Sequence, residues 1–430
     1  MTRILLFLYN MLGVPLSFFG ASIASFMNPK IRKGLQGRKK IIKKVQTSLS
    51  IINVEKPRIW IHVSSYGEFL QVKPVLIELK KFKPDIFIII SFFSPSGYES
   101  VPVEQPIDFK CYLPFDSYFG AKKFIAAIAP SIAVIVRHDI WPNFVWRLKQ
   151  GNIPLILIDA SIQEKSYRLL PVFKIINRKL FSLMQAILAI SDDETTRLRQ
   201  LVDNPEKIIV MGDTKYDQVF ERSQHLDRIS QLLQDPALKD KKIFVVGSSW
   251  QTDEEFLIPA FQQLHQQFND LIMILAPHEP TPDHLEQIEH QLEQSHLTSM
   301  RLSELKSGLF NHHCLIVDQI GLLANIYSLG TVAFVGGSFH YKIHNVLEPV
   351  VYGIPVLFGP KMTNSSEAKH LLKHDAAILV KSIKEIVDVI KHLLENPAQA
   401  NEYGERARQI VMQNVGSSEK IAKFLIRYLS

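Results

Sequence analysis

Cysteine is scarce in this chain of 430 residues, which contains only Cys111 and Cys314. The two cysteines lie far apart, and no His or Cys stands near either of them at metal-ligand spacing. A disulfide framework and a structural zinc site are therefore excluded, and the bulk of the chain is expected in a reducing compartment.

Several catalytic signatures are also missing. The sequence has no GxSxG elbow, no P-loop lysine motif, no HExxH pair and no GxGxxG fingerprint. These absences argue against the commoner hydrolases, nucleoside triphosphatases, zinc peptidases and dinucleotide-binding enzymes. The composition, 47% apolar and 21% charged, is that of a folded protein and predicts order nearly throughout.

Charge is absent from the start of the chain and one-sided after it. Ile4 to Met27 carries no charge and is long enough to cross a bilayer, whereas eight Lys or Arg and no acid lie between Lys30 and Lys44. We interpret residues 1–44 as a membrane anchor with a basic segment that keeps the rest of the chain in the cytoplasm. The basic cluster can also hold lipid phosphates.

Two alternatives to a spanning helix stay open. Asn10 and Pro15 are unusual in a membrane span, so the helix can be tilted or lie at the interface. Ser22 and Ala24 form a small-x-small site after an apolar run, as in a cleaved signal peptide.

The length and the hydrophobic pattern predict two α/β domains. A chain of 430 residues exceeds the usual size of one core. Short β-branched runs alternate with amphipathic stretches, as in βαβ units around a parallel sheet. The polar stretch Gly212 to Lys242 is expected to connect two doubly wound halves, residues 45–220 and 221–430. Ligands bind beyond the carboxyl ends of parallel strands, so we expect the site in a cleft between the halves.

Twelve strands are expected in all. In the first half they are Arg58 to Val63, Ile86 to Ser91, Ile132 to Val136, Pro154 to Ile158, Ala186 to Ile190 and Ile208 to Met211. In the second half they are Lys242 to Val246, Leu271 to Ala276, Cys314 to Val317, Val332 to Val335, Pro355 to Phe358 and Ala377 to Val380. A final amphipathic helix is expected from Ser417 to Leu429 and is assigned to the second domain.

Two carboxylates follow expected strands of the first half. The first strand runs into Ser64-Ser65-Tyr66-Gly67-Glu68, and the third into residues 137–143, which include Asp139. A carboxylate at a strand tip can take a proton from an acceptor hydroxyl, so Glu68 is a candidate general base and Asp139 a second candidate. Glu68 can equally be a first-turn acid that complements the helix dipole, and the loop around Asp139 can be ordinary structure.

A glycine-rich turn follows one strand of the second half. Gly336-Gly337-Ser338 comes directly after that strand, and Asn345 and Glu348 open the next helix. Glycine lets backbone amides approach a phosphate, and Asn345 with the helix N-terminus offers further donors. This pattern predicts a nucleotide-phosphate cradle with Glu348 near the ribose, although the same spacing fits a capping box.

Taken in order, these segments resemble the 3-deoxy-D-manno-octulosonic acid (Kdo) transferases of lipopolysaccharide biosynthesis. The resemblance runs nearly from end to end and begins with the apolar start and its basic follower. The other matching segments are residues 62–68 (HVSSYGE), 95–99 (PSGYE), 112–116 (YLPFD), 140–143 (IWPN), 212–217 (GDTKYD), 335–338 (VGGS), 344–349 (HNVLEP) and 353–360 (GIPVLFGP).

The resemblance implies a GT-B glycosyltransferase of the bacterial inner membrane, with its catalytic domains on the cytoplasmic side. Residues 45–220 would bind the acceptor and residues 221–430 the CMP-linked sugar. Such an enzyme moves Kdo from CMP-Kdo to a lipid A precursor, lipid IVA, with inversion, and the glutamate matching Glu68 is its base. No metal or other cofactor is implied, because the leaving group is a nucleoside monophosphate. The residues implied in substrate binding are Ser64, Ser65, Gly67, Lys215, His278, Gly336, Gly337, Ser338, Asn345 and Glu348.

Two departures from the family pattern stand out. Where the family commonly has Glu-x-Glu before Trp-Pro, this chain has Arg137-His138-Asp139, so one acid is lost and the other is shortened by a methylene. Where the family often has arginine, this chain has His278, so contacts with the donor phosphate could fall to Lys215 or Lys361.

Two further hypotheses stay open beside the Kdo transferase. Another GT-B transferase or epimerase would share the Gly-Gly-Ser turn but would not need Glu68 or the basic segment. An inactive lipid A binding protein would explain Arg137, although the retained Glu68 counts against it. Nucleic-acid binding is not expected, because the basic excess adjoins an apolar anchor and no recognition motif is present.

Overall fold

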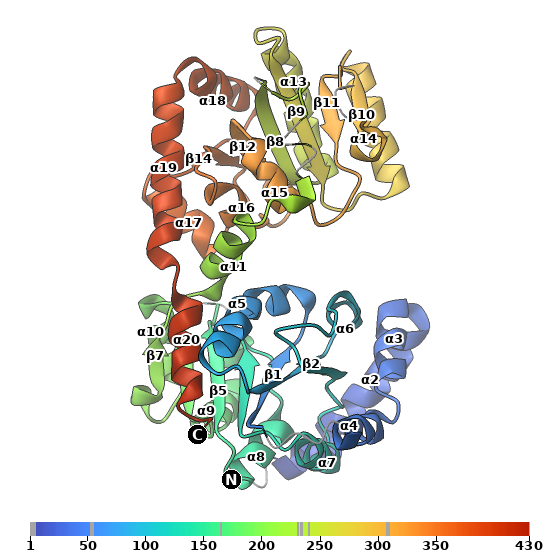
Figure 1. Cartoon of the computed structure of the whole chain (residues 1–430), viewed down its shortest axis with the longest axis vertical. Coiled ribbons are helices and arrows are strands. Elements are labelled where there is room, and N and C mark those ends of the chain that lie inside the picture. Colours follow the sequence, from blue (N-terminus) through green and yellow to red (C-terminus); the bar gives the residue numbers. More distant parts are fainter. Residues whose placement is uncertain are drawn as a thin grey trace. The chain divides into compact units, whose positions relative to one another are not determined.

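The computed structural model describes residues 6–51, 56–163, 166–229, 232, 235–239, 241–306 and 310–429. The chain forms two compact units (Figure 1). Unit 1 comprises Met1–Gln218 together with Gly416–Ser430, and unit 2 comprises Val219–Val415. Each unit is built around its own parallel sheet with helices on both faces, as the sequence predicts.

Unit 1 contains a seven-stranded sheet in the order β3-β2-β1-β4-β5-β6-β7, with every pairing parallel. Its central strands are buried apolar runs, and hydrophobic clusters cover both faces, as a doubly wound sheet requires. The strands are β1 (Arg58–Val63), β2 (Phe87–Phe92), β3 (Phe109–Tyr112), β4 (Ile132–Val136), β5 (Leu155–Ala160), β6 (Ala186–Ala189) and β7 (Ile208–Val210).

Helices of unit 1 fill the crossovers between these strands. They are α5 (Tyr66–Phe82), α6 (Pro95–Ser100), α7 (Tyr118–Ile128), α8 (Pro142–Gln150), η2 (Tyr167–Leu169), α9 (Pro171–Ser182), α10 (Asp192–Leu198), η3 (Arg199–Leu201), η4 (Pro205–Lys207) and α11 (Thr214–Ser223), whose last turns enter unit 2.

Unit 2 repeats this plan with the order β10-β11-β9-β8-β12-β13-β14. The strands are β8 (Lys242–Ser249), β9 (Leu271–Pro277), β10 (Ser299–Arg301), β11 (Cys314–Ile316), β12 (Val332–Val335), β13 (Val356–Phe358) and β14 (Ile378–Leu379). The helices are η5 (Asp227–Ile229), α13 (Gln251–His265), α14 (Pro282–Gln294), η6 (Leu302–Glu304), α15 (Leu323–Ile326), η7 (Tyr327–Leu329), α16 (Leu347–Val350), α17 (Ser366–Lys373), α18 (Ile383–Glu395) and α19 (Pro397–Asn414).

The last helix, α20 (Ser417–Ile426), belongs to unit 1, whereas the sequence analysis assigned it to the second domain. Its apolar face packs on α5 and joins the core of unit 1 through Ile421 and Leu425. The carboxylate of Asp217 accepts hydrogen bonds from the amides of Gly416, at 2.8 Å, and Ser418, at 3.3 Å. The chain therefore leaves unit 1 and re-enters it at adjacent points.

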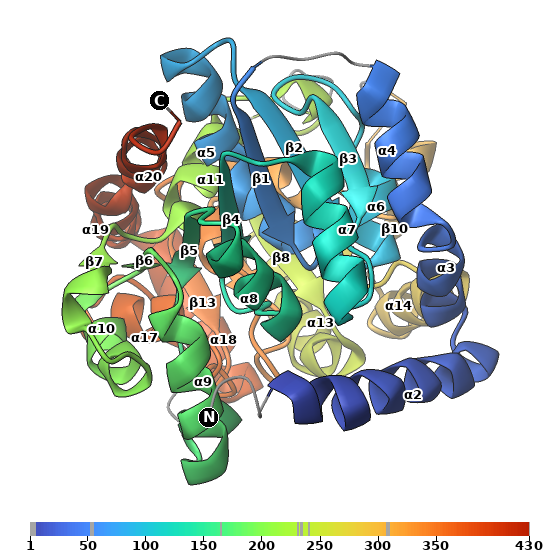
Figure 2. The ribbon, with the colours of Figure 1, turned by 90° about the horizontal axis from the view of Figure 1, so that it is seen from below.

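The N-terminal segment is helical and attached to unit 1. The helical run Leu6–Met27 is long and apolar enough to cross a membrane, and it includes η1 (Tyr9–Gly13), a π-helical turn, and α2 (Val14–Met27). Two further helices, α3 (Pro29–Gly37) and α4 (Ile41–Ile51), follow it. Figure 2 shows α2, α3 and α4 following one another along the edge of unit 1.

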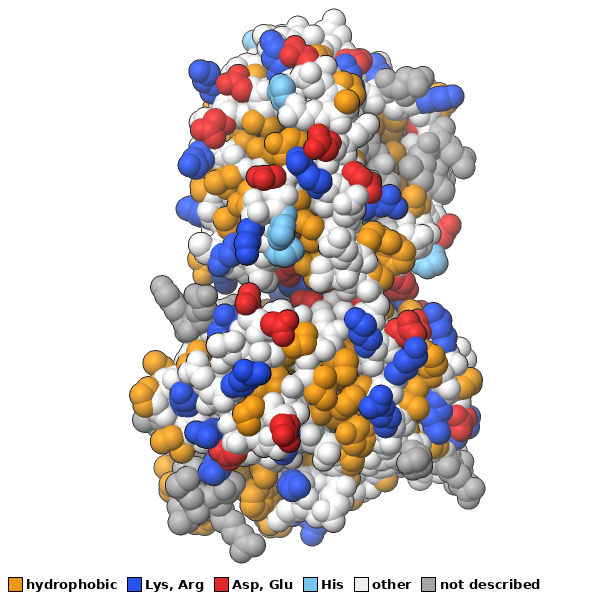
Figure 3. All heavy atoms as spheres, turned by 90° about the vertical axis from the view of Figure 1, so that its left-hand side faces the viewer, with side chains coloured by type: hydrophobic (Ala, Val, Ile, Leu, Met, Phe, Trp, Pro, Cys, Tyr) orange, Lys and Arg blue, Asp and Glu red, His pale blue; other side chains and the backbone are white. Residues whose placement is uncertain are grey.

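Charges of both signs are mixed on one face of the molecule. On the face seen in Figure 3, basic and acidic side chains are interspersed over both units. The one-sided basic stretch Lys30 to Lys44 therefore differs in charge pattern from that face.

Candidate active site

Each sheet reverses its strand order at one point, and the candidate residues follow the strands that flank these points. In unit 1 the reversal lies between β1 and β4, and in unit 2 between β8 and β12. Open parallel sheets bind ligands at such switch points, just beyond the carboxyl ends of the strands. Glu68 and Asp139 follow β1 and β4, as the sequence predicts, and Gly336 follows β12.

Glu68 is held in place by the turn in front of it. Ser65 caps α5 and its Oγ accepts the Glu68 amide at 3.4 Å, while Oε2 of Glu68 accepts the Ser64 amide at 2.6 Å. The residue is only 9% exposed. The structure thus supports both sequence-based interpretations, since Glu68 is a first-turn acid at a helix N-terminus and a fixed carboxylate at a strand tip.

Asp139 is paired with a buried histidine of β1. Nε2 of His62 lies 2.9 Å from Oδ2 of Asp139, and Nδ1 of His62 lies 2.9 Å from Oγ of Ser91. Burial alone would raise the pKa of Asp139, but the hydrogen bond and charge of His62, together with Trp141, bring that pKa below its ordinary value. Asp139 is therefore a fixed carboxylate at neutral pH.

His138, which stands between Arg137 and Asp139 in the sequence, lies near Glu68. Burial lowers the pKa of His138, while the charge of Glu68 acts in the opposite direction. A neutral imidazole is thus expected beside the candidate base at neutral pH.

Lys215 lies in the first turn of α11, shortly after β7. Its amide donates to Oδ1 of Asp213 at 2.9 Å, which fixes the turn that opens α11. This places Lys215 in unit 1, beside Asp213 and Thr214, so its predicted contact with the donor stays a prediction.

The Gly-Gly-Ser turn of unit 2 is held by an acid that the sequence analysis did not single out. The carboxylate of Asp253, in the first turn of α13, accepts the amides of Gly337 at 2.7 Å, Phe339 at 2.9 Å and Trp250 at 3.0 Å. A side chain at Gly336 would meet the backbone of Ser248, and Gly337 has a φ of +77°.

Internal hydrogen bonds engage several groups of the turn that was predicted to bind a phosphate. The amide of Gly336 donates to Gly247 O at 2.8 Å, and the hydroxyl of Ser338 donates to Val335 O and accepts from Gly359 N. The amides of Gly336 and Gly337 and the hydroxyl of Ser338 are therefore bonded within the protein. The glycines thus allow close backbone packing in this turn, and its contact with a nucleotide phosphate stays a prediction.

Asn345 and Glu348 stand together at the start of α16. Oδ1 of Asn345 accepts the Leu347 amide at 3.2 Å, and its Nδ2 donates to Oε1 of Glu348 at 3.4 Å. Burial raises the pKa of Glu348, while the charge of Arg222, 4.0 Å away, and the bond from Asn345 oppose that rise. The arrangement is a helix-start network of the kind weighed from the sequence, and contact with a nucleotide stays a prediction.

Three histidines gather around Trp250 at the carboxyl edge of the second sheet. The ring of Trp250 lies 4.9 Å from that of His278 and 5.0 Å from that of His340, and its Nε1 donates to Nε2 of His344 at 3.0 Å. His278 and His344 stack at 4.1 Å. Burial lowers the pKa of His278, and burial and then the charge of His278 lower that of His344 to about 4.

The sequence analysis proposed His278 but gave no role to the other members of this group. His344 was noted only within the matching segment 344–349, and Trp250 was not singled out. The signal that could have joined them is their position after β8 and β12. His340 lies in the same loop as His344 and carried no separate signal.

Comparison with known proteins now decides between the hypotheses. A sequence model of the family described as 3-Deoxy-D-manno-octulosonic-acid transferase (kdotransferase) matches residues 34–218. A 3-deoxy-D-manno-octulosonic acid transferase of Chlamydophila psittaci is 28% identical over 382 residues, which are 87% of this chain and 86% of that protein. One of Haemophilus influenzae is 25% identical over 375 residues, which are 86% of this chain and 87% of that protein.

The family model covers residues 34–218 and the relatives cover most of the chain, so the chain is similar to Kdo transferases over most of its length. On this similarity it is assigned to the glycosyltransferases. A UDP-GlcNAc 2-epimerase of Neisseria meningitidis bound to UDP-GlcNAc shares the fold at a TM-score of 0.62 and 16% identity, over 86% of this chain and 99% of that one. The GT-B fold predicted from the sequence is thus confirmed, and these similarities agree with the predicted resemblance to Kdo transferases.

Proposed function

We propose that this Kdo transferase uses CMP-Kdo as donor and a lipid A precursor as acceptor, with Glu68 as general base. The observation that carries this proposal is the carboxylate of Glu68, fixed 2.6 Å from the Ser64 amide at the tip of β1, beside the switch point of the first sheet. A base must be held within reach of the proton that it removes, and this turn supplies such a position.

The proposed step is a single displacement. Glu68 takes the proton from an acceptor hydroxyl, the hydroxyl oxygen bonds to the anomeric carbon of Kdo, and the bond from that carbon to the CMP phosphate oxygen breaks. CMP leaves with the electron pair, and the configuration at the anomeric carbon is inverted. The bond from Ser64 orients the carboxylate, and no metal is expected to take part.

Asp139 supplies a second fixed carboxylate in unit 1. Its pKa is lowered, so it stays ionised while Glu68 gains a proton. We assign Asp139 the role of orienting the acceptor, because His62 holds one of its oxygens and fixes the direction of the carboxylate. Ser64, Ser65 and Gly67 form the turn that carries the base.

The donor is assigned to unit 2. Its phosphate and sugar carboxylate are anionic, and His278, His340 and His344 are polar side chains that surround Trp250 at the sheet edge. An indole ring also offers a stacking face for a nucleobase. Lys361 is a further cation proposed for the donor phosphate.

We place the enzyme at the cytoplasmic face of the inner membrane. The apolar helix Leu6–Met27 and the basic residues after it support this proposal, because the anionic lipids of the cytoplasmic leaflet attract basic residues beside an apolar segment. The acceptor is a lipid, so an enzyme at this surface meets its substrate there.

The test follows lipid mass. Purified enzyme in detergent receives CMP-Kdo, generated in situ, and a tetra-acylated lipid A precursor, and mass spectrometry counts the added Kdo units. Glu68→Gln, which keeps the shape and loses the base, is expected to lower kcat by about 10² to 10⁴ without loss of CMP binding. Glu78→Gln, in the same helix, is the matched control and should keep wild-type activity.

Each other result has a definite meaning. Full activity of Glu68→Gln would remove Glu68 from the role of base. Absence of Kdo addition by the wild-type enzyme, with CMP still bound, would contradict the proposed acceptor, and absence of CMP binding would contradict the proposed donor.

A further inference from the structure

The helical run Leu6–Met27 is attached to unit 1 along one of its faces. Partly covered residues recur along it at a spacing of three or four, with one gap of seven, as expected when one face of a helix rests on a surface. These residues are Leu6, Tyr9, Asn10, Gly13, Val14, Ala21, Ser22, Ala24 and Ser25.

Polar side chains tie the beginning of this run to buried groups. Nδ2 of Asn10 donates to Oδ1 of Asn143 at 2.8 Å, and Oδ1 of Asn10 accepts the Tyr118 amide at 3.1 Å. Tyr9 hydrogen-bonds to the carboxylate of Asp116, which is only 4% exposed. The asparagine that argued against a membrane span therefore has a protein partner.

Phe18, in the middle of the helical run, and Arg38, directly after α3, contact the same short loop. We call residues 113–116 the docking loop. Its Phe115 packs edge-on against Phe18 at 5.4 Å, and its Leu113 carbonyl accepts a hydrogen bond from Nε of Arg38 at 2.9 Å. Arg38 is largely buried, and burial lowers its pKa to about 10.

Helix α3 brings the chain back into contact with the rest of unit 1. Nζ of Lys33 lies 2.7 Å from Oε2 of Glu99, and Gly37 lies against the ring of Tyr112. Tyr112 is part of the core of unit 1, so the chain contacts that core again within a short distance of Met27.

These ties are incompatible with a bilayer-spanning helix. A helix of 22 residues is about 33 Å long, which is the thickness of the hydrocarbon core of a bilayer. The ends of a spanning helix would lie on opposite sides of the membrane. Asn10 and Arg38 nevertheless bind the same unit, and the docking loop contacts both Tyr9, near the start of the helix, and Arg38, eleven residues after its end.

The free face of the run is largely apolar. Its large side chains are roughly half to nine-tenths exposed, so a partner must cover them if they are to leave water. They are Phe7, Leu8, Met11, Leu12, Leu16, Phe19, Ile23, Phe26 and Met27.

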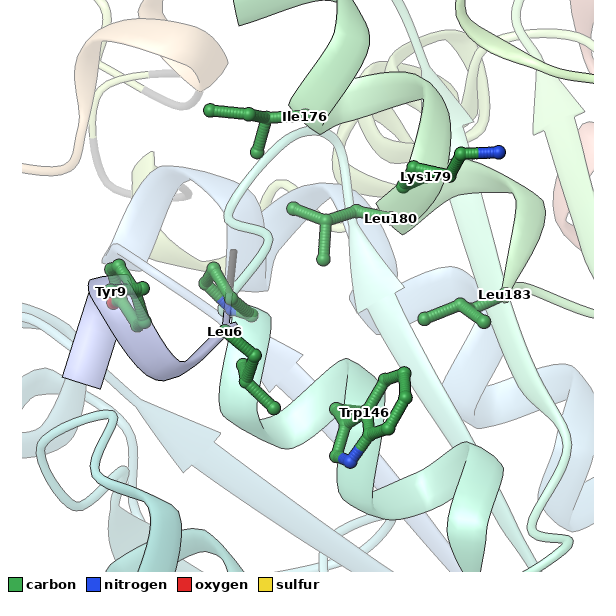
Figure 4. A pocket seen from close by; sticks show the side chains of 8 residues that line it. Leu6, Tyr9, Trp146, Ile176, Lys179, Leu180 and Leu183 are labelled. Carbon is green, nitrogen blue, oxygen red and sulfur yellow. The ribbon is translucent and has the colours of Figure 1, made fainter. Parts of the chain in front are cut away.

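A second apolar surface adjoins the beginning of this run. A cavity of about 100 Å³ lies between Leu6 and Tyr9 on one side and α8 and α9 on the other (Figure 4). Its other lining residues are Pro142, Trp146, Ile176, Lys179, Leu180 and Leu183. Beside it, η2 and α9 expose Tyr167, Phe173 and Ile175, and Leu170 between them is exposed as well.

Cations accompany both surfaces. Lys174, Arg178 and Lys179 lie on α9 among the exposed apolar residues, and Lys30, Lys39, Lys40, Lys43 and Lys44 follow the helical run. Apolar faces bordered by Lys and Arg are typical of helices that lie in the plane of a membrane with anionic head groups.

We propose that Leu6–Met27 lies in the plane of the membrane surface and, together with η2 and α9, forms one membrane-binding face for a bilayer with anionic head groups. Membrane attachment is then monotopic, and the docking loop sets the orientation of unit 1 on the lipid surface. This inference depends on membrane association and is independent of the proposed donor, acceptor and base.

The depth of the helix in lipid tests the orientation. Single cysteines replace Leu12, Leu16, Ile23 and Met27, which lie on the free side of the helix, in a full-length chain whose Cys111 and Cys314 are changed to alanine. Spin labels at these sites are measured on vesicles of phosphatidylethanolamine and phosphatidylglycerol in equal amounts. All four should lie at a similar depth of about 5–10 Å.

A spanning helix gives a different profile. The segment from Leu12 to Met27 would then extend over about 22 Å of depth, and Leu16 and Ile23 would lie deepest. Such a graded profile would overturn the proposal. A label at Ser22→Cys, on the side that faces unit 1, should be shallower than its neighbours in the in-plane arrangement.

Helix α9 is tested separately by charge. The double variant Phe173→Glu with Ile175→Glu should bind the same vesicles at least about tenfold more weakly than the wild type. Ile320→Glu, an exposed apolar residue of unit 2, is the matched control and should bind as the wild type does. Unchanged binding of the double variant would remove α9 from the proposed face. Tighter binding of the wild type to vesicles of phosphatidylcholine than to vesicles with anionic lipid would contradict the role of the cations.

Discussion

The Nη2 atom of Arg137 lies 3.5 Å from Oδ1 of Asp213, and both side chains are largely buried. A second buried acid, Asp159, accepts bonds from the amide and hydroxyl of Thr214, at 3.2 and 2.5 Å. The charge of Arg137 lowers the pKa of Asp159, in opposition to burial and the charge of Asp213. The family's glutamate at this position would add a third acid here, so the departure at Arg137 fits its surroundings.

Loss of this cation should destabilise unit 1. Arg137→Gln leaves Asp159 and Asp213 without this positive partner, and we expect the free energy of unfolding to fall by about 3 kcal/mol. Arg178→Gln, which breaks an exposed ion pair with Asp203, is the control and should cost less than about 1 kcal/mol. Urea unfolding followed by tryptophan fluorescence measures both. Equal effects of the two variants would contradict the buried role of Arg137.

The stability of unit 1 should also depend on pH through Asp159. Burial, with the charge of Asp213 next, raises the pKa of Asp159 to about 7, whereas the unfolded value is about 3.9. The folded protein therefore holds more protons than the unfolded chain between these values, and this contribution to stability is lost as pH rises from about 4 through about 7. Unfolding midpoints across that window should decline less in Asp159→Asn, and an unchanged slope would exclude Asp159 as the cause.

Replacement of His62 should move the acid limb of the activity profile. Without His62, burial would act on Asp139 with less opposition, so the pKa of Asp139 should rise. In His62→Asn, activity should therefore begin to fall at a higher pH than in the wild type. Ser91→Ala keeps the pair of His62 and Asp139 and should leave that limb in place. Profiles of kcat/KM against pH test this, and an unmoved limb would mean that Asp139 does not govern it.

Restoration of the family's arginine should strengthen donor binding. The lowered pKa of His278 makes it mostly neutral at pH 7, whereas arginine is always charged and can bind phosphate with two hydrogen bonds. His278→Arg should lower the KM for CMP-Kdo several-fold near neutral pH and leave kcat similar. Titration of the donor at two pH values measures this, and an unchanged KM would place the donor phosphate away from residue 278.

Most of the fold could be predicted from the sequence because its central strands are buried on both faces and read as continuous apolar runs. All twelve expected strands are present, whereas β3 (Phe109–Tyr112) and β10 (Ser299–Arg301) were missed. Both are edge strands, and β10 is partly exposed and contains Ser299 and Arg301. The helix α20 was recognised as amphipathic, but periodicity gives no indication of which domain its apolar face meets.

The candidate site was predictable where a residue closely follows a strand. Glu68 and Asp139 stand at the expected strand tips, and His278 does so as well. Asp253 was missed because an acid in the first turn of a helix is common, and its bonds to Gly337 and Phe339 join residues more than eighty positions apart. The packing role of Gly336 and Gly337 was not foreseen, because a phosphate site and tight internal packing leave an identical sequence pattern.

The bond between Asp217 and Gly416 gives the chain a modular construction. Unit 2 is a continuous insertion, Val219–Val415, and the two cut ends of unit 1 are adjacent because the carboxylate of Asp217 accepts the Gly416 amide at 2.8 Å. A short glycine-serine linker could join those ends, so unit 1 becomes an excisable domain whose proposed lipid binding can be studied without unit 2.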